Sequence, residues 1–149
     1  MTPIDWNDVY HVGIVVPELD TAMADLGAAL GLTWPTPQTR RRTFRGPDGA
    51  FEAELRFVYS VEGPPHLELI EQVPGTPWET GPGIHHVGVW VDHLAEAAAR
   101  LTDRGVPVEV TYDTPELQSF TYHRLPGGLR VELVDRTRRS GIETWLGGG

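Results

Sequence analysis

Cysteine is absent from this chain of 149 residues, which excludes a disulfide framework and thiolate chemistry. Long apolar runs are also absent, since no stretch approaches the ~20 residues that a membrane-spanning helix needs. The N-terminus lacks a basic region followed by an apolar stretch, so a secretory signal peptide is not expected. These absences predict a protein without membrane contacts that resides in the cytoplasm.

Basic residues are scarce: 12 Lys and Arg stand against 21 Asp and Glu, a net charge of −9. This balance argues against nucleic acid as the main partner, because phosphate binding needs a basic face. The clearest basic cluster is Arg40-Arg41-Arg42 with Arg45. We interpret it as a solvated strand or loop; the alternative is an anchor for a substrate phosphate or carboxylate. A smaller cluster comprises Arg136, Arg138 and Arg139.

Two motifs occur twice and in the same order. The pattern His-Val-Gly-aliphatic-x-Val begins at His11 and again at His86, 75 positions later (86 − 11). The stretch His-Leu-Glu-Leu-Ile-Glu around Glu68 returns as Arg-Val-Glu-Leu-Val-Asp around Glu132, 64 positions later (132 − 68). Two ordered repeats indicate one module written twice.

Hydrophobic periodicity predicts the same order of elements in each half. In the first half we expect strand 9–16, a helix capped by Asp20 or Thr21 and ending at Leu30, and strands 39–45, 51–61 and 66–73. In the second half we expect strand 84–91, helix 93–104 and strands 107–112, 118–125 and 129–135, followed by a short helix over 140–146. The predicted fold class is α+β, with two tandem βαβββ modules that form a curved sheet around a metal-containing cavity.

The expected organisation is one domain over residues 1–149. Module one covers about 8–73, a linker rich in Pro and Gly covers 74–83, module two covers about 84–136, and 137–149 form a C-terminal tail. A four-stranded sheet with one helix buries only one of its faces well. We therefore expect two modules to pair around a concave cavity, either within one chain or across a homodimer.

Four polar side chains are predicted to point into this cavity. Residues i and i+2 of a strand share a face, which directs His11, Glu68, His86 and Glu132 away from the helix layer. Taken singly, each is better explained as a hydrogen-bonded histidine or a solvent-facing glutamate. The symmetric set favours a site for one divalent ion (Co, Ni, Zn, Mn or Fe), which would remove the cost of unpaired charges in a cavity.

The same alternation assigns the residues beside these four. Tyr10 and His85 fall on the helix face, so His85 is not expected to be a ligand, whereas Trp90 shares the cavity face of His86. A tight Gly127-Gly128 turn would place His123 opposite Glu132 in the pocket. A loop longer or shorter by one residue would place Tyr122 there instead.

The 64-residue offset pairs His123 with Tyr59, so either residue is a candidate to assist catalysis. Tyr59, Trp90 and Tyr122 are the expected substrate-pocket residues.

At these residues the chain resembles the vicinal oxygen chelate superfamily, which includes glyoxalase I, extradiol dioxygenases, methylmalonyl-CoA epimerase and the bleomycin- and fosfomycin-resistance proteins. The resemblance covers about residues 9–136: the paired modules, the strand-opening histidines and the two glutamate strands. Residues 66–71 followed by Pro74, with residues 83–87 and 91–94, are most similar to the methylmalonyl-CoA epimerase branch. The segment 121–126 departs from that branch, because Tyr122 takes the place of its histidine.

The resemblance implies a metal-dependent epimerase, isomerase or lyase that removes a proton next to a carbonyl. Glu132 matches the family position that is both metal ligand and base, and Glu52 falls near the other acid/base. Glu52 could equally be a surface residue, since Glu54 shares its face. The implied partner is a small molecule, such as an acyl-CoA thioester.

Two other functions fit the same residues. In an Fe(II) extradiol dioxygenase His11, His86 and Glu132 would form a facial triad, but Glu68 as a fourth ligand would occupy a position that oxygen needs. A non-enzymatic binding or resistance protein would instead sequester an aromatic compound. Its stacking surface would comprise Trp34, Trp78, Trp90 and Trp145.

Overall fold

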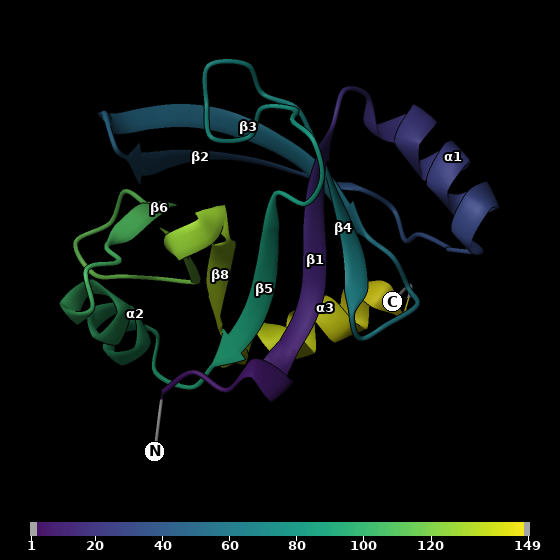
Figure 1. Ribbon diagram of the computed structural model, residues 1–149. Helices are drawn as coiled ribbons and strands as arrows, with labels where there is room; N and C mark the ends of the chain where they lie inside the picture. The colour runs from purple at the N-terminus through teal and green to yellow at the C-terminus, as the bar shows by residue number, and fades with distance from the viewer. Residues whose placement is uncertain (1–2, 148–149) are drawn as a thin grey trace.

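Eight β-strands form a closed barrel in the computed structural model, which describes residues 3–147 (Figure 1). The first module comprises β1 (Val9–Val16), α1 (Leu19–Leu30), β2 (Gln38–Gly46), β3 (Gly49–Tyr59) and β4 (His66–Glu71). The second comprises β5 (His86–Val91), α2 (Leu94–Asp103), β6 (Val108–Tyr112), β7 (Phe120–Arg124) and β8 (Arg130–Asp135), and α3 (Arg139–Leu146) follows. Short 3₁₀ turns cover Trp6–Asp8, Pro126–Gly128 and Arg136–Arg138. The predicted α+β fold of two βαβββ modules is confirmed.

The strands follow the order β1-β4-β3-β2-β6-β7-β8-β5 around the barrel. In each module the last strand lies parallel to the first, β4 beside β1 and β8 beside β5. The modules meet at two seams, where β1 pairs with β5 and β2 pairs with β6, both antiparallel. The modules thus pair within one chain, a choice that the sequence left open.

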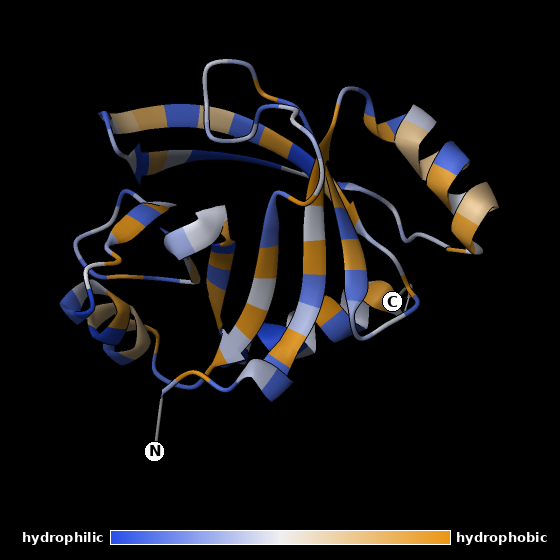
Figure 2. Ribbon diagram, viewed as in Figure 1, coloured by the Kyte–Doolittle hydropathy of each residue, from blue (hydrophilic) through white to orange (hydrophobic). Residues whose placement is uncertain are grey.

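The first two helices cover the outside of the barrel, on opposite sides of the molecule (Figure 1). Leu19 of α1 belongs to one buried cluster with Val58 and Leu69, and Ala97 of α2 belongs to another with Val89 and Leu133. Apolar and polar residues alternate along the strands (Figure 2). One face of each strand therefore points outward, toward the helices, and the other face lines the barrel interior. No helix in the described part of the chain is long and apolar enough to cross a membrane.

A tertiary contact, rather than a local cap, begins α1. We expected Asp20 or Thr21 as the N-cap, and this was wrong: the helix begins at Leu19, and Glu18 at the N-cap makes no capping hydrogen bond. The backbone N–H of Leu19 instead donates to Oε2 of Glu71 at 2.9 Å. A carboxylate from β4 therefore satisfies a free N–H of the first turn.

A β-bulge in β1 changes the side on which Tyr10 lies. Val9 pairs with Val89, whereas His11 pairs with Gly88, so Tyr10 is the extra residue on β1. Its side chain joins the interior cluster of Tyr59 and Trp90. The predicted helix-face position of Tyr10 is wrong, because a bulge shifts the alternation by one residue.

The segment between β4 and β5 does more than connect the modules. Trp78 lies in this segment and is only 1% exposed, in the interior cluster that contains Phe44 and Tyr122. The Val73 N–H donates to the Trp78 carbonyl at 2.8 Å, which closes a local turn. The predicted linker residues thus contribute to the barrel core. Within the predicted C-terminal tail, 137–149, residues 148–149 lie outside the described range.

Candidate metal centre

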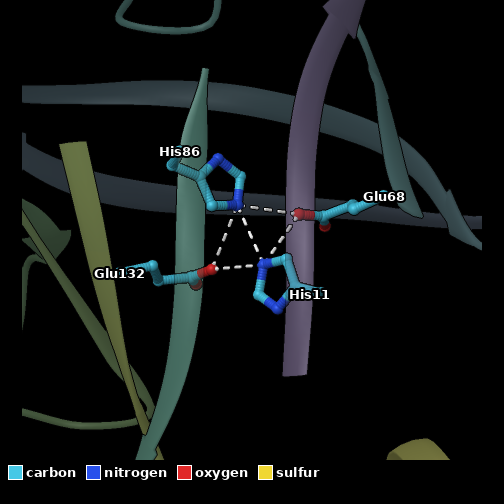
Figure 3. A group of neighbouring side chains, drawn as sticks. All are labelled: His11, Glu68, His86 and Glu132. Carbon is cyan, nitrogen blue, oxygen red and sulfur yellow. Dashed lines mark hydrogen bonds and ion pairs between the residues drawn. The ribbon is translucent and has the colours of Figure 1, made fainter. Parts of the chain in front are cut away.

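Four neighbouring strands bring the four predicted ligands together. His11 lies on β1, Glu68 on β4, His86 on β5 and Glu132 on β8, and these strands are adjacent in the order β4-β1-β5-β8. Figure 3 shows the four side chains pointing toward one another. One ligand atom from each residue lies within 4.8 Å of all the others.

The distances in this cluster reflect the internal repeat. Nε2 of His11 lies 3.0 Å from Oε1 of Glu132, and Nε2 of His86 lies 3.0 Å from Oε1 of Glu68. The two remaining His–Glu distances are both 3.3 Å. The two Nε2 atoms lie 2.9 Å apart. The contacts of His11 with the two glutamates therefore match those of His86, as the internal repeat requires.

The glycine of each His-Val-Gly motif makes room for the histidine of the other. Gly13 pairs with His86 across the β1–β5 seam, and Gly88 pairs with His11. A Cβ at either glycine would overlap the facing imidazole, at 2.6 Å from its Nε2 atom. The motif thus combines a histidine of the cluster with the space for the corresponding histidine of the other module.

The donor set fits a divalent metal ion. Two imidazole nitrogens and two carboxylates suit Fe, Mn, Co, Ni or Zn. The buried Oε1 atom of Glu68 lies 3.0 Å from Nε2 of His86 and 3.3 Å from Nε2 of His11, but neither contact has the angles of a good hydrogen bond. A cation bound between the four side chains would satisfy this oxygen and neutralise the two carboxylates. The cluster could therefore hold one ion.

Without a metal the cluster holds protons. Burial lowers the pKa of His11, but hydrogen bonds to Glu132 and Glu68 outweigh burial and raise this pKa to about 9. Burial raises the pKa of Glu132, and hydrogen bonds from His11 and His86 outweigh it and lower this pKa to about 2. Metal binding must displace the imidazole protons, which makes metal affinity depend on pH.

His85 orients the His86 ring through its Nδ1 atom, the nitrogen that does not face the cluster. Nε2 of His85 lies 2.8 Å from the Pro77 carbonyl, which can only accept, so this nitrogen carries the proton. Burial, together with the positive charge of His86, lowers the pKa of His85 to about 4, so its ring is neutral. Its Nδ1 atom, 2.9 Å from Nδ1 of His86, therefore accepts the proton of that nitrogen. Once deprotonated for metal binding, His86 presents the lone pair of Nε2 to the site.

His85 is not one of the four clustered residues, but its predicted position on the helix face is wrong. Its ring centroid lies 5.2 Å from that of His86 and 5.7 Å from that of Tyr122. The strand β5 begins only at His86, so strand alternation does not govern residue 85.

The cluster borders an aromatic cavity of about 430 Å³. Glu68 and Glu132 line this cavity, whereas both histidines are fully buried behind them. The aromatic lining includes Phe44, Phe57, Tyr59, Trp78, Tyr122 and Trp145. A small molecule in the cavity would meet the centre on its carboxylate side.

Two of the three expected pocket residues line the cavity. Tyr59 stacks on His11 with ring centroids 5.0 Å apart, and Tyr122 lies 5.1 Å from His86 in the equivalent place. Trp90 does not line the cavity. The bulge in β1 turns Tyr10 toward the cavity, and the Trp90 ring stacks against the Tyr10 ring with centroids 3.7 Å apart.

The expected aromatic stacking surface also changes. Trp78 and Trp145 line the cavity, whereas Trp34 packs beside α1 and its Nε1 donates to the Met23 carbonyl at 3.0 Å. Nε1 of Trp145 donates to the Thr36 carbonyl at 2.9 Å, which ties α3 to the segment before β2.

His123 does not face Glu132, contrary to our expectation. Tyr122 pairs with Glu132, and His123 pairs with Val131. The loop between β7 and β8 therefore differs in length by one residue from the assumed Gly127-Gly128 turn, which is the case that places Tyr122 opposite Glu132. The buried His123 ring lies within hydrogen-bond distance of Thr121 Oγ1 (2.9 Å) and the Val106 carbonyl (3.2 Å). The partner of Tyr59 under the repeat is therefore Tyr122, and His123 has no access to the cavity.

Glu52 also lies away from the centre. It pairs with Thr43 in the β2–β3 hairpin, and its side chain is 65% exposed and 3.5 Å from Arg41. Tyr59, which lies on the same strand, pairs with Glu68. Glu52 lies seven residues before Tyr59, which corresponds to roughly 23 Å along the strand. The acid/base role expected of Glu52 is not compatible with this position.

Sequence reasoning missed Tyr10 as a cavity residue, and it named Trp78 only as part of the stacking surface of the alternative binding protein. Trp78 carried a usable signal, because a large aromatic in a Pro- and Gly-rich linker needs a burial site. Tyr10 carried none, since the bulge arises from pairing with β5 rather than from the local sequence.

Comparisons with known proteins agree with this architecture. A family model described as the Glyoxalase/Bleomycin resistance protein/Dioxygenase superfamily matches residues 10–122. A search of curated proteins gave no match.

Among solved structures, methylmalonyl-CoA epimerase from Mycobacterium tuberculosis is 22% identical, with a TM-score of 0.60 over 91% of this chain and 90% of its own. A methylmalonyl-CoA epimerase in complex with methylmalonyl-CoA and NH4+ is 22% identical, with a TM-score of 0.62 over 86% and 93%. A Streptomyces coelicolor methylmalonyl-CoA epimerase variant in complex with 2-nitronate-propionyl-CoA is 21% identical, with a TM-score of 0.61 over 85% and 92%. At these identities the likeness establishes a shared fold.

Proposed function

The chain belongs to the glyoxalase/bleomycin resistance protein/dioxygenase superfamily, and from this membership we propose that it is a metal-dependent epimerase, isomerase or lyase. It would remove a proton next to a substrate carbonyl. One observation carries the proposal: two imidazoles and two carboxylates converge at the wall of an aromatic cavity. The epimerase names of the structural neighbours agree with it.

His11, Glu68, His86 and Glu132 would hold one divalent ion, either Co, Ni, Zn, Mn or Fe. A bound divalent ion supplies positive charge that stabilises the negative oxygen of an enolate. A substrate with a carbonyl and a second oxygen nearby suits such a centre. Acyl-CoA thioesters are the first class to test, because two neighbours were solved with CoA esters.

Glu132 is the proposed base. Its carboxylate borders the cavity, where it is within reach of a bound substrate. Burial favours the protonated form of this carboxylate, whereas a cation held by the four side chains would favour the charged form that can act as a base.

Glu68 replaces Glu52 as the second acid/base in this proposal. It is related to Glu132 by the internal repeat and also lines the cavity. Two carboxylates at one centre suit epimerisation, in which one group would remove a proton and the other would return a proton to the opposite face.

Tyr59 and Tyr122 are proposed to orient the substrate. Burial and the nearby carboxylates raise the pKa of each phenol well above its usual value, so both hydroxyls remain protonated. A neutral phenol can donate a hydrogen bond to a substrate oxygen.

Metal analysis is the first test. Protein dialysed without chelator is analysed by mass spectrometry beside a His86→Ala/Glu132→Ala variant. We expect about one divalent ion per chain, lost in this variant. A His93→Ala/Glu52→Ala variant is the matched control, because it removes the same residue types from exposed positions. Wild-type protein that binds no Co, Ni, Zn, Mn or Fe would overturn the proposal.

Proton transfer is the second test. Acyl-CoA thioesters are incubated with metal-loaded protein in D2O, and deuterium at the carbon next to the carbonyl is followed by NMR. We expect exchange with wild type and its loss in Glu132→Gln, which keeps the size of the side chain.

The aromatic cavity also favours a second candidate, a binding protein that sequesters an aromatic compound. Ligand affinity that is unchanged by demetallation would support this candidate. The Fe(II) dioxygenase is less well supported, since all four side chains converge and leave fewer positions for oxygen. The expected homodimer and cytoplasmic residence stay predictions, of which sedimentation would test the first.

A further inference from the structure

A second cavity of about 500 Å³ adjoins the aromatic cavity and carries the basic residues that the proposed reaction does not use. The two cavities share Arg40, Tyr112, Ser119 and Arg138 in their linings. Arg42 also lines the second cavity. Positive charge thus gathers at the mouth of the candidate site, although the whole chain carries a net charge of −9.

The shared arginines are not neutralised by acidic neighbours. Within residues 3–147, neither Arg40 nor Arg138 forms an ion pair with a carboxylate, whereas their chain neighbours do. Arg41 lies 3.5 Å from Glu52, and Arg139 lies 3.2 Å from Glu143. Asp113 also lines the second cavity, and its carboxylate pairs with Arg45 at 3.8 Å.

Neutral partners hold both guanidinium groups. Arg40 donates to Oε1 of Gln38 at 2.9 Å, and Arg138 donates to Oγ of Ser119 at 2.9 Å. A guanidinium has five N–H donors, so each arginine keeps donors for a ligand. Neither partner reduces the positive charge.

Ser119, which accepts the hydrogen bond from Arg138, has a left-handed backbone conformation. Its φ of 67° is the single left-handed value of a non-glycine residue in the described chain. Its carbonyl accepts a hydrogen bond from the Asp135 N–H at 2.9 Å, which fixes the segment beside β8. Such strain persists where the surroundings hold it, typically at functional sites.

Strand alternation separates the arginines of β2. Arg40 and Arg42 line the cavities, whereas Arg41 lies between them in sequence and pairs with Glu52. Arg138 ends the 3₁₀ turn and lines the cavities, whereas Arg139 begins α3 and pairs with Glu143. Each cavity arginine therefore has a neighbour of identical charge outside the cavities.

We propose that Arg40 and Arg138 form an anion-binding subsite for a carboxylate or phosphate that the substrate carries away from its reacting carbonyl. The assignment rests on the proposed function for the position of that carbonyl, beside Glu68 and Glu132. The aromatic cavity between the two ends accommodates an apolar middle portion. Arginine binds carboxylates and phosphates through paired charge-assisted hydrogen bonds. An anchored tail positions the reacting carbon relative to the base.

Three acyl thioester probes test the subsite by calorimetric titration of the protein as purified. S-propionyl-N-acetylcysteamine is neutral, S-glutaryl-N-acetylcysteamine adds a distal carboxylate, and propionyl-CoA adds phosphates. We expect at least one anionic probe to bind roughly tenfold or more tightly than the neutral probe. The probe with the larger gain identifies whether the subsite takes a carboxylate or a phosphate.

Two double variants complete the test. Arg40→Gln/Arg138→Gln is expected to lose the preference for the anionic probe and to bind the neutral probe as wild type does. Arg41→Gln/Arg139→Gln removes the same charge and is expected to keep the preference. Equal preference in the two variants, or wild type that binds neither anionic probe more tightly than the neutral one, would overturn the subsite. Because binding is measured without turnover, a protein that keeps this preference but exchanges no proton retains the subsite and loses the proposed function.

Discussion

Contacts across the β1–β5 seam explain why residues 13 and 88 are glycines. Each faces the histidine of the other module, and the missing side chain is the space that the imidazole fills. The repeated His-Val-Gly motif therefore encodes both halves of one centre. A change at either glycine acts on the histidine of the opposite module.

Gly88→Ala is expected to displace the His11 ring and to lower metal affinity severely. The added methyl group would also overpack the interior, which costs about 1–3 kcal/mol. Metal titration and thermal unfolding would measure the two effects. Gly81→Ala is the control, because a Cβ there meets no atom within 4 Å and the backbone is not left-handed. Wild-type metal affinity in Gly88→Ala would contradict this account of the motif.

His85→Ala is expected to weaken metal binding roughly 10- to 100-fold, the usual effect of losing a hydrogen-bond partner of a metal-ligating histidine. The variant leaves Nδ1 of His86 without its acceptor, so the ring orientation is no longer fixed. A competitive chelator titration would measure the change, with exposed His93→Ala as control. Equal affinity in the two variants would show that His85 has no orienting role.

The stability of the metal-free protein should depend on pH through His11. Its folded pKa of about 9 exceeds the ordinary value of 6.5, so its contribution is complete below pH 6.5 and lost as pH rises through 9. Glu132 has the opposite sign: its folded pKa of about 2 lies below 4.5, so its contribution is present above pH 4.5 and lost as pH falls through 2.

We therefore expect the free energy of unfolding of metal-free protein to fall between pH 6.5 and 9, measured by urea titration. Metal affinity should rise over the same interval, because fewer protons compete. His11→Gln should show a smaller fall in stability than wild type, and exposed His93→Gln should match wild type. A wild-type stability that stays constant over this interval would refute the assignment.

At the scale of elements, the connection between β4 and β5 acts as part of the core. Its Trp78 ring fills the barrel interior beside Phe44, and its Nε1 donates to the Tyr122 hydroxyl at 3.1 Å. The Trp78 side chain thus joins this connection to the aromatic cavity and to β7.

Trp78→Ala is expected to destabilise the protein by about 3–5 kcal/mol, the usual cost of deleting a buried tryptophan. Trp78→Phe should cost less, since it keeps most of the volume and loses the hydrogen bond to Tyr122. Chemical denaturation would measure both values. Trp6→Ala is the control, because Trp6 is 62% exposed. A loss below 1 kcal/mol for Trp78→Ala would show that the connection is not part of the core.

At the scale of the whole molecule, two unequal seams close the barrel. The β1–β5 seam has four residue pairs and carries both histidines, whereas the β2–β6 seam has two pairs, Phe44 with Tyr112 and Arg45 with Thr111. The shorter seam also borders the arginine-lined cavity. Opening there would widen the route to the site and leave the centre intact.

Hydrogen exchange should reveal this inequality. We expect amide protons of the β2–β6 seam to exchange faster than those of the β1–β5 seam, because fewer contacts must break to open it. Mass spectrometry or NMR of the native protein would resolve the two seams. Addition of metal should slow exchange chiefly at β1 and β5. Slower exchange at β2 and β6 than at β1 and β5 would refute this ranking.

The two modules, the order of their elements, the bounds of the strands to within two residues and the four converging residues all followed from the chain's own pattern. These features are local or repeated. Strand alternation follows from the backbone, and the repeat relates His11 to His86 and Glu68 to Glu132 without knowledge of the fold.

The tertiary structure alone decided which neighbours face the centre. The bulge at Tyr10, the register that pairs Tyr122 with Glu132, and the burial of Trp78 all depend on contacts between strands far apart in the chain. One residue of slip sends a side chain to the other face of a sheet. Strand pairing therefore excluded His123 and Glu52 from the site and brought Arg40 to its mouth, because register is a property of two strands and not of one.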